Sequence, residues 1–174
     1  MPGASHYIAC FMQLHRDVDP QYWSADTLGK APHKPLLLLC VLDQYATDPG
    51  RANRIVPNQE LEESFNFYWE LLDLSGTPST FSLPFFHLQT DGFWHLVGVG
   101  NKDVDERARR TPRALREHVE RAYVDAELHE ILRNGEWRSH LKSVLITANF
   151  DPSLHERLLL RRHAEKHATS ERVT

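Results

Sequence analysis

The stretch GKAPHKPLLLLCVLDQY, residues 29–45, decides the fold prediction, because it places two prolines directly before a long apolar run. Proline is tolerated in the first turn of a helix and fixes where that helix begins. The run from Leu36 to Leu42 is apolar on every side, which is typical of a helix that lies deep in a core. Asp48-Pro49-Gly50 predicts where the helix ends. The chain is therefore expected to fold around one buried helix.

Further helices are expected on both sides of this central one, from apolar periodicity and capping residues. The predicted loops are residues 16–30, 76–79 and 101–110. The predicted helices are Tyr7–His15, a helix capped by Asn58 that runs to about Leu74, and four near the C-terminus that begin at Thr111-Pro112, Asp125 (closed by Gly135), Glu136 and Asp151-Pro152.

A hairpin is predicted for Leu83–Val99, with its turn near Thr90-Asp91-Gly92, because Asp-Gly is a strong turn signal between apolar runs. Ile55-Val56 is a further short extended piece. The fold class is therefore α+β and mostly helical, with four to six helices around a small antiparallel sheet or hairpin. We expect a single domain over residues 1–160, followed by a polar, frayed tail over residues 161–174.

The composition is globular, with 174 residues, 41% hydrophobic and 25% charged. The longest apolar run has seven residues, Leu36 to Leu42, whereas a membrane-spanning helix needs roughly 20. The N-terminus lacks the pattern of a secretory signal, and two cysteines cannot form a disulfide scaffold. We therefore expect a cytoplasmic protein with buried free thiols and no membrane partner. The net charge of -4 argues against coating nucleic acid by bulk charge.

Common enzyme motifs are absent: the chain has no P-loop, GxGxxG fingerprint, HExxH pair or GxSxG elbow. One alternative that stays open is a small metal-dependent nuclease that uses His87, Asp91 and His95 across the predicted hairpin. A variant of it would pair His87 or His95 with His118 on a following helix. Another alternative is a protein-interaction domain of a restriction system. The anion-binding interpretation that follows implies no cofactor or metal.

The start of the central helix is a candidate anion site. A helix N-terminus presents unpaired N–H groups and partial positive charge, and it binds phosphate-like anions. Lys30, His33 and Lys34 add side-chain donors, whereas Pro32 and Pro35 add rigid apolar surface without N–H groups. This combination suits an anion with one soft, weakly hydrated face.

A family resemblance joins these motifs. Leu14-His15-Arg16, GKAPHKPLLLL, Asn53-Arg54-Ile55 and LPFFHLQTDGFWHL follow one another along the chain. Their order resembles the sulfur-binding domain of phosphorothioate-dependent HNH restriction endonucleases, over residues 8–150. The resemblance implies recognition of double-stranded DNA in which sulfur replaces a non-bridging phosphate oxygen, in the Rp form. It also implies a separate HNH nuclease domain as partner. No HNH segment follows residue 150, so the chain resembles the recognition domain alone and is not expected to be an enzyme.

The resemblance and the chemistry together give the expected site. We expect Pro32 and Pro35, with Ala31, to form an apolar cup for the sulfur, while Lys34 and the helix amides hold the oxygen side. Arg16 would lay its guanidinium over the same site, beside His33. Other expected DNA contacts are His15, Lys30, the loop residues Arg51, Asn53 and Arg54, the hairpin residues His87 and Gln89, and the phosphate clamps Arg107, Arg109 and Arg110.

Overall fold

The computed structural model describes residues 2–19, 21–74 and 79–159 of the chain. The predicted loop 76–79 and the predicted tail 161–174 fall wholly or mostly outside these residues. The α-helices and strands are α1 (Pro2–Met12), α2 (His33–Thr47), α3 (Gln59–Leu71), α4 (Ser82–His87), β1 (Trp94–Gly98), α5 (Pro112–His118), β2 (Val119–Val124), α6 (Ala126–Arg133) and α7 (Gly135–Asn149), with a further helix over residues 152–159. Short 3-10 helices lie at η1 (Ala25–Thr27), η2 (Leu88–Asp91), η3 (Val99–Asn101) and η4 (Glu106–Arg109).

The prediction of a central buried helix is confirmed. All seven residues from Leu36 to Leu42 in α2 are at most 3% exposed. Pro35 lies in the first turn of α2, where its missing N–H costs no hydrogen bond, and Asp48 follows its last turn. The apolar run therefore sets both the place and the direction of α2, and its N-terminus becomes a fixed point for the loops around it.

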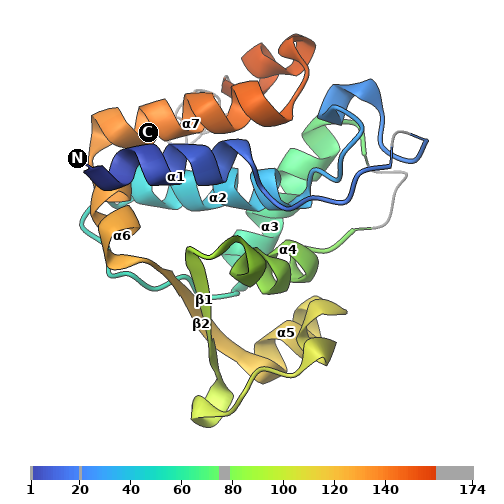
Figure 1. The fold of residues 1–174 in the computed structure, drawn as a ribbon. Coiled ribbons are helices and arrows are strands. Elements are labelled where there is room, and N and C mark those ends of the chain that lie inside the picture. Colours follow the sequence, from blue (N-terminus) through green and yellow to red (C-terminus); the bar gives the residue numbers. More distant parts are fainter. Residues whose placement is uncertain (1, 20, 75–78, 160–174) are drawn as a thin grey trace, which may run out of the picture.

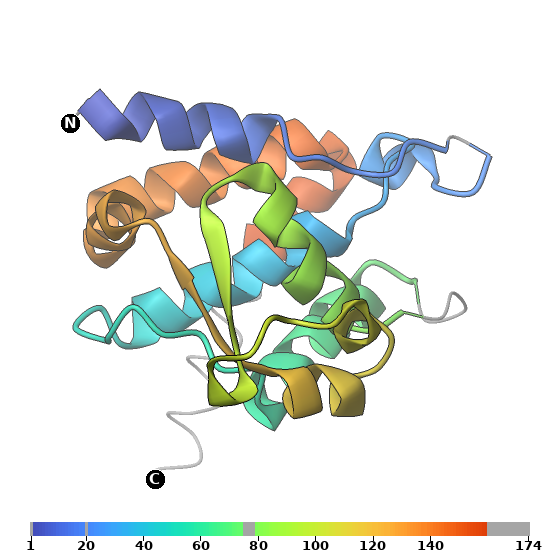
Figure 2. The ribbon, with the colours of Figure 1, turned by 60° about the horizontal axis from the view of Figure 1, so that its bottom comes forward.

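Several other elements pack around α2 (Figures 1 and 2). Helix α7 packs against both α1 and α2, while α3 and α4 pack against other parts of α2. The two strands form a ribbon that crosses beside the helices, and α5 lies at its far end (Figure 1). The fold is thus α+β and mostly helical, as predicted, although it has more than the expected four to six helices because several are short.

The predicted hairpin over Leu83–Val99 is wrong. Its second arm is β1, but its first arm forms α4 and η2, and β1 instead pairs antiparallel with β2. Short apolar runs do not distinguish a strand from a helix, and Pro84 in the first turn favours the helix. The Asp-Gly signal marks the end of η2, where Gly92 has a φ of 90°. The extended piece at Ile55 is confirmed, since it bridges to Ala122 of β2.

Other boundaries also differ from the prediction. The first helix, α1, runs from Pro2 to Met12 and not from Tyr7 to His15. The helix that Thr111 and Pro112 open stops at His118, and the next six residues form β2. Gly135 does not close α6: Asn134 separates the two helices, accepts a bond from the Trp137 amide, and Gly135 begins α7. A side-chain cap at the second helix therefore outweighs the usual preference for glycine after the first.

The interior is largely aromatic and aliphatic. Trp94 and Phe93 are at most 1% exposed, and Trp69 is 6% exposed. Cys40 is buried and Cys10 is half-buried, and neither of these two cysteines forms a disulfide. Within the described residues, no helix combines the length and apolar character needed to cross a membrane.

Candidate functional site

A hollow of about 370 Å³ opens beside the N-terminus of α2. It lies between the segment that follows α1, the first turn of α2, and the end of α4 with η2. Its lining combines cationic, imidazole and apolar side chains: His15, Arg16, Asp17, Trp23, Ala31, His33, Lys34, Leu83, Pro84, His87 and Thr90. Six of these, His15, Arg16, Ala31, His33, Lys34 and His87, were predicted from the sequence as site residues, so the fold brings together segments more than fifty residues apart.

The loop before α2 is tied down by its own backbone. Asp19 N donates to Gly29 O and Ala31 N donates to Asp17 O, which pairs the two sides of the loop. Leu28 and Gly29 both have positive φ, at 58° and 71°, and this sharp reversal carries the chain back to Ala31. Pro32 then caps α2. The loop at the rim of the hollow is therefore held in place by hydrogen bonds within its own backbone.

The Arg16 side chain binds the backbone of this loop. Its guanidinium donates to the carbonyls of Ala31, at 2.7 Å, and of Thr27 and Lys30, each at 3.2 Å. It also donates to Asn149 Oδ1 at 2.9 Å, from the last turn of α7. Burial lowers the pKa of Arg16 to about 10, so the group keeps its charge at neutral pH. Arg16 thus brings positive charge to the hollow while fixing the carbonyls around it.

Lys34 is paired inside the protein. Its ammonium lies 2.6 Å from Asp91 Oδ2 and donates to Thr90 Oγ1 at 3.2 Å, and its side chain is 9% exposed. Asp91 also accepts a bond from the backbone N–H of His15 at 2.8 Å. The aspartate of the supposed hairpin turn is therefore a buried counter-charge that joins η2 to α2 and to the segment after α1. Within the described residues, the hydrogen-bond partners of the Arg16 guanidinium are three carbonyls and one amide oxygen, so no carboxylate among them is bonded to this second cation of the lining.

Two imidazoles in the lining are neutral near pH 7. Burial, with the nearby Arg16 charge, lowers the pKa of His33 to about 4. Its ring lies 4.9 Å from that of Trp69 and 5.4 Å from that of Trp23. Burial and the charges of Lys34 and Arg109 lower the pKa of His87. These histidines can offer N–H or lone-pair contacts to a ligand without adding net charge.

The apolar wall of the hollow is wider than the sequence indicated. Trp23, Leu83 and Pro84 line it together with Ala31. Pro32 and Pro35 are both buried where α2 begins, directly after Ala31 and Lys34 in the chain, but neither is among the residues lining the hollow. Sequence reasoning missed Trp23 and Leu83-Pro84 because they belong to segments read as loop and hairpin. The proposed proline cup stays a prediction.

A comparison with models of protein families places this geometry in context. Residues 12–163 match the family described as ScoMcrA-like, DNA sulfur-binding domain. The chain belongs to this family. A comparison with curated proteins found no match. Membership confirms the resemblance read from the motifs, and it indicates DNA sulfur binding in restriction, a role of binding rather than catalysis.

In this sulfur-binding domain, one group of predicted DNA contacts lies away from the hollow. Arg51, Asn53 and Arg54 follow the C-terminal end of α2, whereas the hollow lies at its N-terminal end. The fifteen residues of α2 span about 22 Å at 1.5 Å per residue. Asn53 binds the backbone of Val124, donating at 2.7 Å and accepting at 2.9 Å. Asn53 therefore joins this loop to β2, and its side chain is already engaged.

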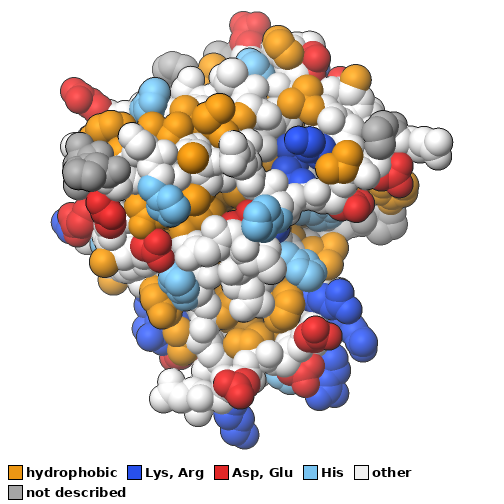
Figure 3. Space-filling model, viewed as in Figure 1, with side chains coloured by type: hydrophobic (Ala, Val, Ile, Leu, Met, Phe, Trp, Pro, Cys, Tyr) orange, Lys and Arg blue, Asp and Glu red, His pale blue; other side chains and the backbone are white. Residues whose placement is uncertain are grey.

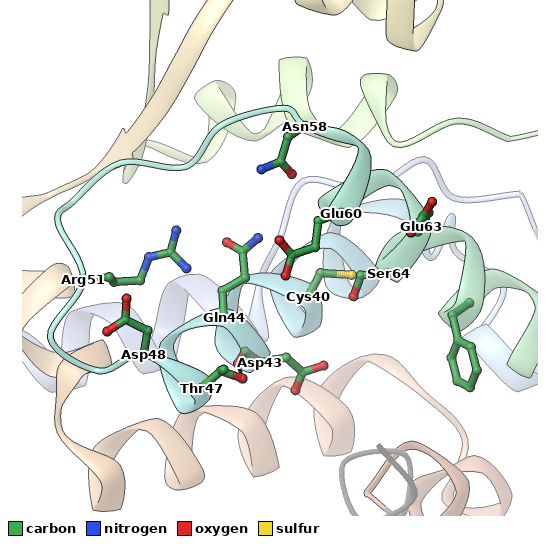
Figure 4. Close-up of a pocket in the computed structure, with 11 residues that line it drawn as sticks. Cys40, Asp43, Gln44, Thr47, Asp48, Arg51, Asn58, Glu60, Glu63 and Ser64 are labelled. Carbon is green, nitrogen blue, oxygen red and sulfur yellow. Dashed lines mark hydrogen bonds between the residues drawn. The ribbon is translucent and has the colours of Figure 1, made fainter. Parts of the chain in front are cut away.

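A larger hollow of about 570 Å³ lies between α2 and α3 near this loop (Figure 4). Figure 4 shows Asp43 and Asp48 from α2 and its end, and Glu60 and Glu63 from α3, around it. Arg51 is the cation of its lining. Four carboxylates repel a phosphate backbone, so this hollow is a poor DNA site despite its size.

The remaining predicted DNA contacts differ in their exposure and in their bonding to other residues. Arg109 acts electrostatically on His87 and so lies near the hollow beside α2. Arg110 is exposed, whereas Arg107 is bonded to Asp105 at 2.9 Å. Lys30 is exposed beside the hollow, with its carbonyl bonded to Arg16. Gln89 is exposed on η2 and does not lie on a hairpin face with His87, because no hairpin forms there.

The residues of the nuclease alternative are separated. Asp91 binds Lys34, and His95 Nε2 lies 2.6 Å from Asp125 Oδ1. Among the residues that the structure describes, no three His, Cys, Asp or Glu side chains are grouped to hold a metal ion. The geometry therefore gives the nuclease interpretation no support.

Proposed function

We propose that this sulfur-binding domain recognises phosphorothioate-modified double-stranded DNA and seats the modified phosphate in the hollow beside α2. The site would be formed by Arg16, Ala31, His33 and Lys34, over the buried Pro32 and Pro35. Trp23, Leu83 and Pro84 extend its apolar side. Recognition depends on the bases around the modification, and the domain serves as the targeting part of a modification-dependent restriction system.

The observation that carries the proposal is the combination of few free donors with an apolar wall. An ordinary phosphate oxygen buried in protein needs a hydrogen-bond donor. Here Arg16 gives four of its bonds to protein acceptors, Lys34 is paired with Asp91, and His33 is neutral. The same lining holds the apolar side chains of Trp23, Leu83 and Pro84 and the carboxylate of Asp17. A phosphate bound there therefore meets both cationic groups and carbon.

A phosphorothioate fits this asymmetry because sulfur is larger, more polarisable and less strongly hydrated than oxygen. Apolar contact over a few tens of Å² contributes about 1 kcal/mol at about 25 cal/mol per Å². A phosphate oxygen placed against the same wall would lose its water without gaining a partner, at about 1–3 kcal/mol. The larger part of the discrimination therefore comes from rejecting oxygen.

The surface around the hollow supports a wider DNA footprint. Figure 3 shows histidine side chains spread across this face, with Lys and Arg side chains beside the hollow and over η4 and α5. His15 is exposed, with its side chain 70% accessible. We expect His15, Lys30, His87, Arg109 and Arg110 to contact the backbone on either side of the modified phosphate. Binding then weakens with added salt, because each neutralised phosphate releases counterions.

The domain is proposed to act with a separate nuclease. By the family resemblance, the partner is an HNH domain, and the recognition part spans residues 1–160 with a tail beyond it. We expect it to act in the cytoplasm, where the modified DNA would be met.

The test is fluorescence anisotropy with two labelled duplexes that differ in one Rp phosphorothioate, at about 0.1 M salt. We expect at least tenfold tighter binding of the modified duplex, which equals about 1.4 kcal/mol. The Sp duplex is the matched control, because it carries the same sulfur on the other non-bridging position. Equal affinities for all three duplexes would contradict the proposal.

A further inference from the structure

Asn149, the last residue of α7, is a buried polar side chain whose amide contacts three separate segments. It is 2% exposed. Its Oδ1 accepts a hydrogen bond from Arg16 Nη1 at 2.9 Å, while its Nδ2 donates to Phe11 O at 3.1 Å and to Leu145 O at 2.8 Å. Helices α1 and α7 run side by side (Figure 1), so Asn149 joins the ends of both helices to the segment that carries Arg16.

The three partners fix the direction of the Asn149 amide. An asparagine amide has one oxygen that accepts and one nitrogen that donates. Reversing it would place the nitrogen against the Arg16 guanidinium and the oxygen against two carbonyl oxygens. All three hydrogen bonds would then be lost, so the side chain presents its oxygen to Arg16. Asn149 is not among the residues lining the hollow beside α2, whereas Arg16 is, so Asn149 acts on a ligand through Arg16.

Among the described residues, Asn149 is the partner of Arg16 that lies outside the loop before α2. The other three partners belong to that loop: the carbonyls of Thr27, Lys30 and Ala31. A guanidinium is planar and rigid, so a bond to Nη1 from a different element fixes its orientation. The same segment also binds the loop directly, because Asp151 N donates to Asp26 O at 2.9 Å. The end of α7 therefore fixes both the guanidinium and the loop at the rim of the hollow.

The chemistry of Asn149 decides how much of Arg16 remains for a ligand. A guanidinium has five N–H groups, and Arg16 makes four hydrogen bonds to protein. The Asn149 oxygen occupies one of the two N–H groups on Nη1, which leaves few donors for a phosphate oxygen. This oxygen is neutral, so it leaves the charge of Arg16 uncompensated, whereas Asp91 compensates the charge of Lys34. A bound anion therefore meets the positive charge of Arg16 but few of its N–H groups.

From these contacts, we infer that Asn149 is a positioning residue for phosphorothioate recognition. It holds the Arg16 guanidinium in one orientation at the hollow and occupies an N–H group that an ordinary phosphate oxygen could use, and it adds no negative charge. The inference rests on the proposed function, since it takes the hollow beside α2 as the place where the modified phosphate binds.

The first test is Asn149→Leu, which keeps the branched shape of the side chain but removes the oxygen that Arg16 binds. The released N–H group can then bind an ordinary phosphate oxygen, and the guanidinium is held by the loop alone. We expect the ratio of affinities for Rp-modified and unmodified duplexes to fall by at least about fivefold, the value of one hydrogen bond. Fluorescence anisotropy at about 0.1 M salt measures the ratio, and urea unfolding shows whether the variant is folded.

The second test is Asn149→Asp, which keeps an oxygen at this position and adds a negative charge. The introduced carboxylate should compensate the charge of Arg16, as Asp91 does for Lys34. We expect affinity for the modified duplex to fall by about tenfold or more. A plot of log affinity against log salt concentration should become shallower by about one phosphate contact. This variant decides the question if Asn149→Leu does not fold.

Two further variants separate positioning from a purely structural role. Asn53→Leu is the matched control, because Asn53 is a half-buried asparagine that binds the backbone of Val124 at the far end of α2. It should lower stability but keep the ratio. In Arg16→Met/Asn149→Leu, the ratio should stay within about twofold of that of Arg16→Met, because Asn149 acts through the guanidinium.

An unchanged ratio in a folded Asn149→Leu, or an unchanged affinity in a folded Asn149→Asp, overturns the inference. So does a double variant whose loss equals the product of the two single losses, since Asn149 would then act independently of Arg16. Failure of the proposed function is visible separately, as a wild-type chain that binds modified and unmodified duplexes alike.

Discussion

Lys34 and Asp91 form a buried ion pair, with 2.6 Å between Nζ and Oδ2, which joins the first turn of α2 to the end of η2. Asp91 also accepts a hydrogen bond from the backbone N–H of His15, so three separate segments around the hollow beside α2 meet at one carboxylate. A buried pair of this kind adds little net stability compared with a well-packed apolar pair, but losing one partner is costly. The pair therefore fixes the relative position of the two walls of the hollow.

Asp91→Asn should destabilise the protein by about 3–5 kcal/mol, because the ammonium of Lys34 would remain buried without a counter-charge. Urea unfolding monitored by tryptophan fluorescence measures the change. The double variant Lys34→Met/Asp91→Leu should recover much of the loss. Asp105→Asn is the control, since the exposed pair of Asp105 with Arg107 should leave the unfolding midpoint unchanged. A single variant as stable as wild type would show that the pair is not buried in solution.

Arg16→Lys should weaken binding of the modified duplex by at least tenfold and lower stability by about 1–3 kcal/mol. Lysine keeps the charge, but one ammonium cannot reach the carbonyls of Thr27, Lys30 and Ala31 together with Asn149. Anisotropy and urea unfolding measure the two effects. Arg113→Lys, at a 90% exposed side chain paired with Glu117, should change neither. If Arg16→Lys bound the modified duplex as tightly as wild type, the Arg16 guanidinium would not be part of the binding site.

Stability should fall as the pH is lowered from about 6.5 to about 4, because His33 is held neutral in the folded chain. Its folded pKa is about 4 and its ordinary value is 6.5, so the unfolded chain binds the proton first. The folded chain therefore has its full stability with respect to His33 above pH 6.5. Up to about 3 kcal/mol of its free energy of unfolding is lost as the pH falls through the folded pKa. Urea unfolding of wild type and His33→Gln at pH 7.5 and 5 tests this.

The difference between the two pH values should be smaller in His33→Gln. His140→Gln, at an exposed histidine of α7, serves as the control and should keep the wild-type pH dependence. A wild-type stability that does not change between pH 7.5 and 5 would contradict burial of a neutral His33.

The sequence was most informative where one local signal acts alone. Two prolines before an apolar run located α2, and Asn58 and Thr111 capped helices where predicted. The sheet could not be predicted in the same way, because β2, the partner of β1, lies about 25 residues further along the chain and comes after α5 in the sequence. Periodicity reports which residues are apolar, and it does not report which distant strand completes the pair.

The site shows the same division. Ala31, His33 and Lys34 were found because they flank the start of one predicted helix, whereas His15 and Arg16 were found through the family resemblance. Trp23, Leu83 and Pro84 reach the hollow only through tertiary packing, and the pairing of Lys34 with Asp91 depends on η2 replacing a hairpin turn. Long-range contacts between segments with ambiguous local signals therefore account for what sequence reasoning missed.

Asn53→Ala should lower stability by about 1–3 kcal/mol while leaving the preference for phosphorothioate DNA intact. The side chain exchanges two hydrogen bonds with the backbone of Val124, and removing it leaves a buried strand residue with an unpaired N–H and C=O. Arg54→Ala, at the exposed neighbour in the same loop, should leave stability unchanged. Urea unfolding gives the first effect, and the ratio of affinities for modified and unmodified duplexes gives the second. If Asn53→Ala kept its stability but lost this ratio, the loop would belong to the DNA interface, and the duplex would have to extend along α2 from the hollow to its C-terminal end.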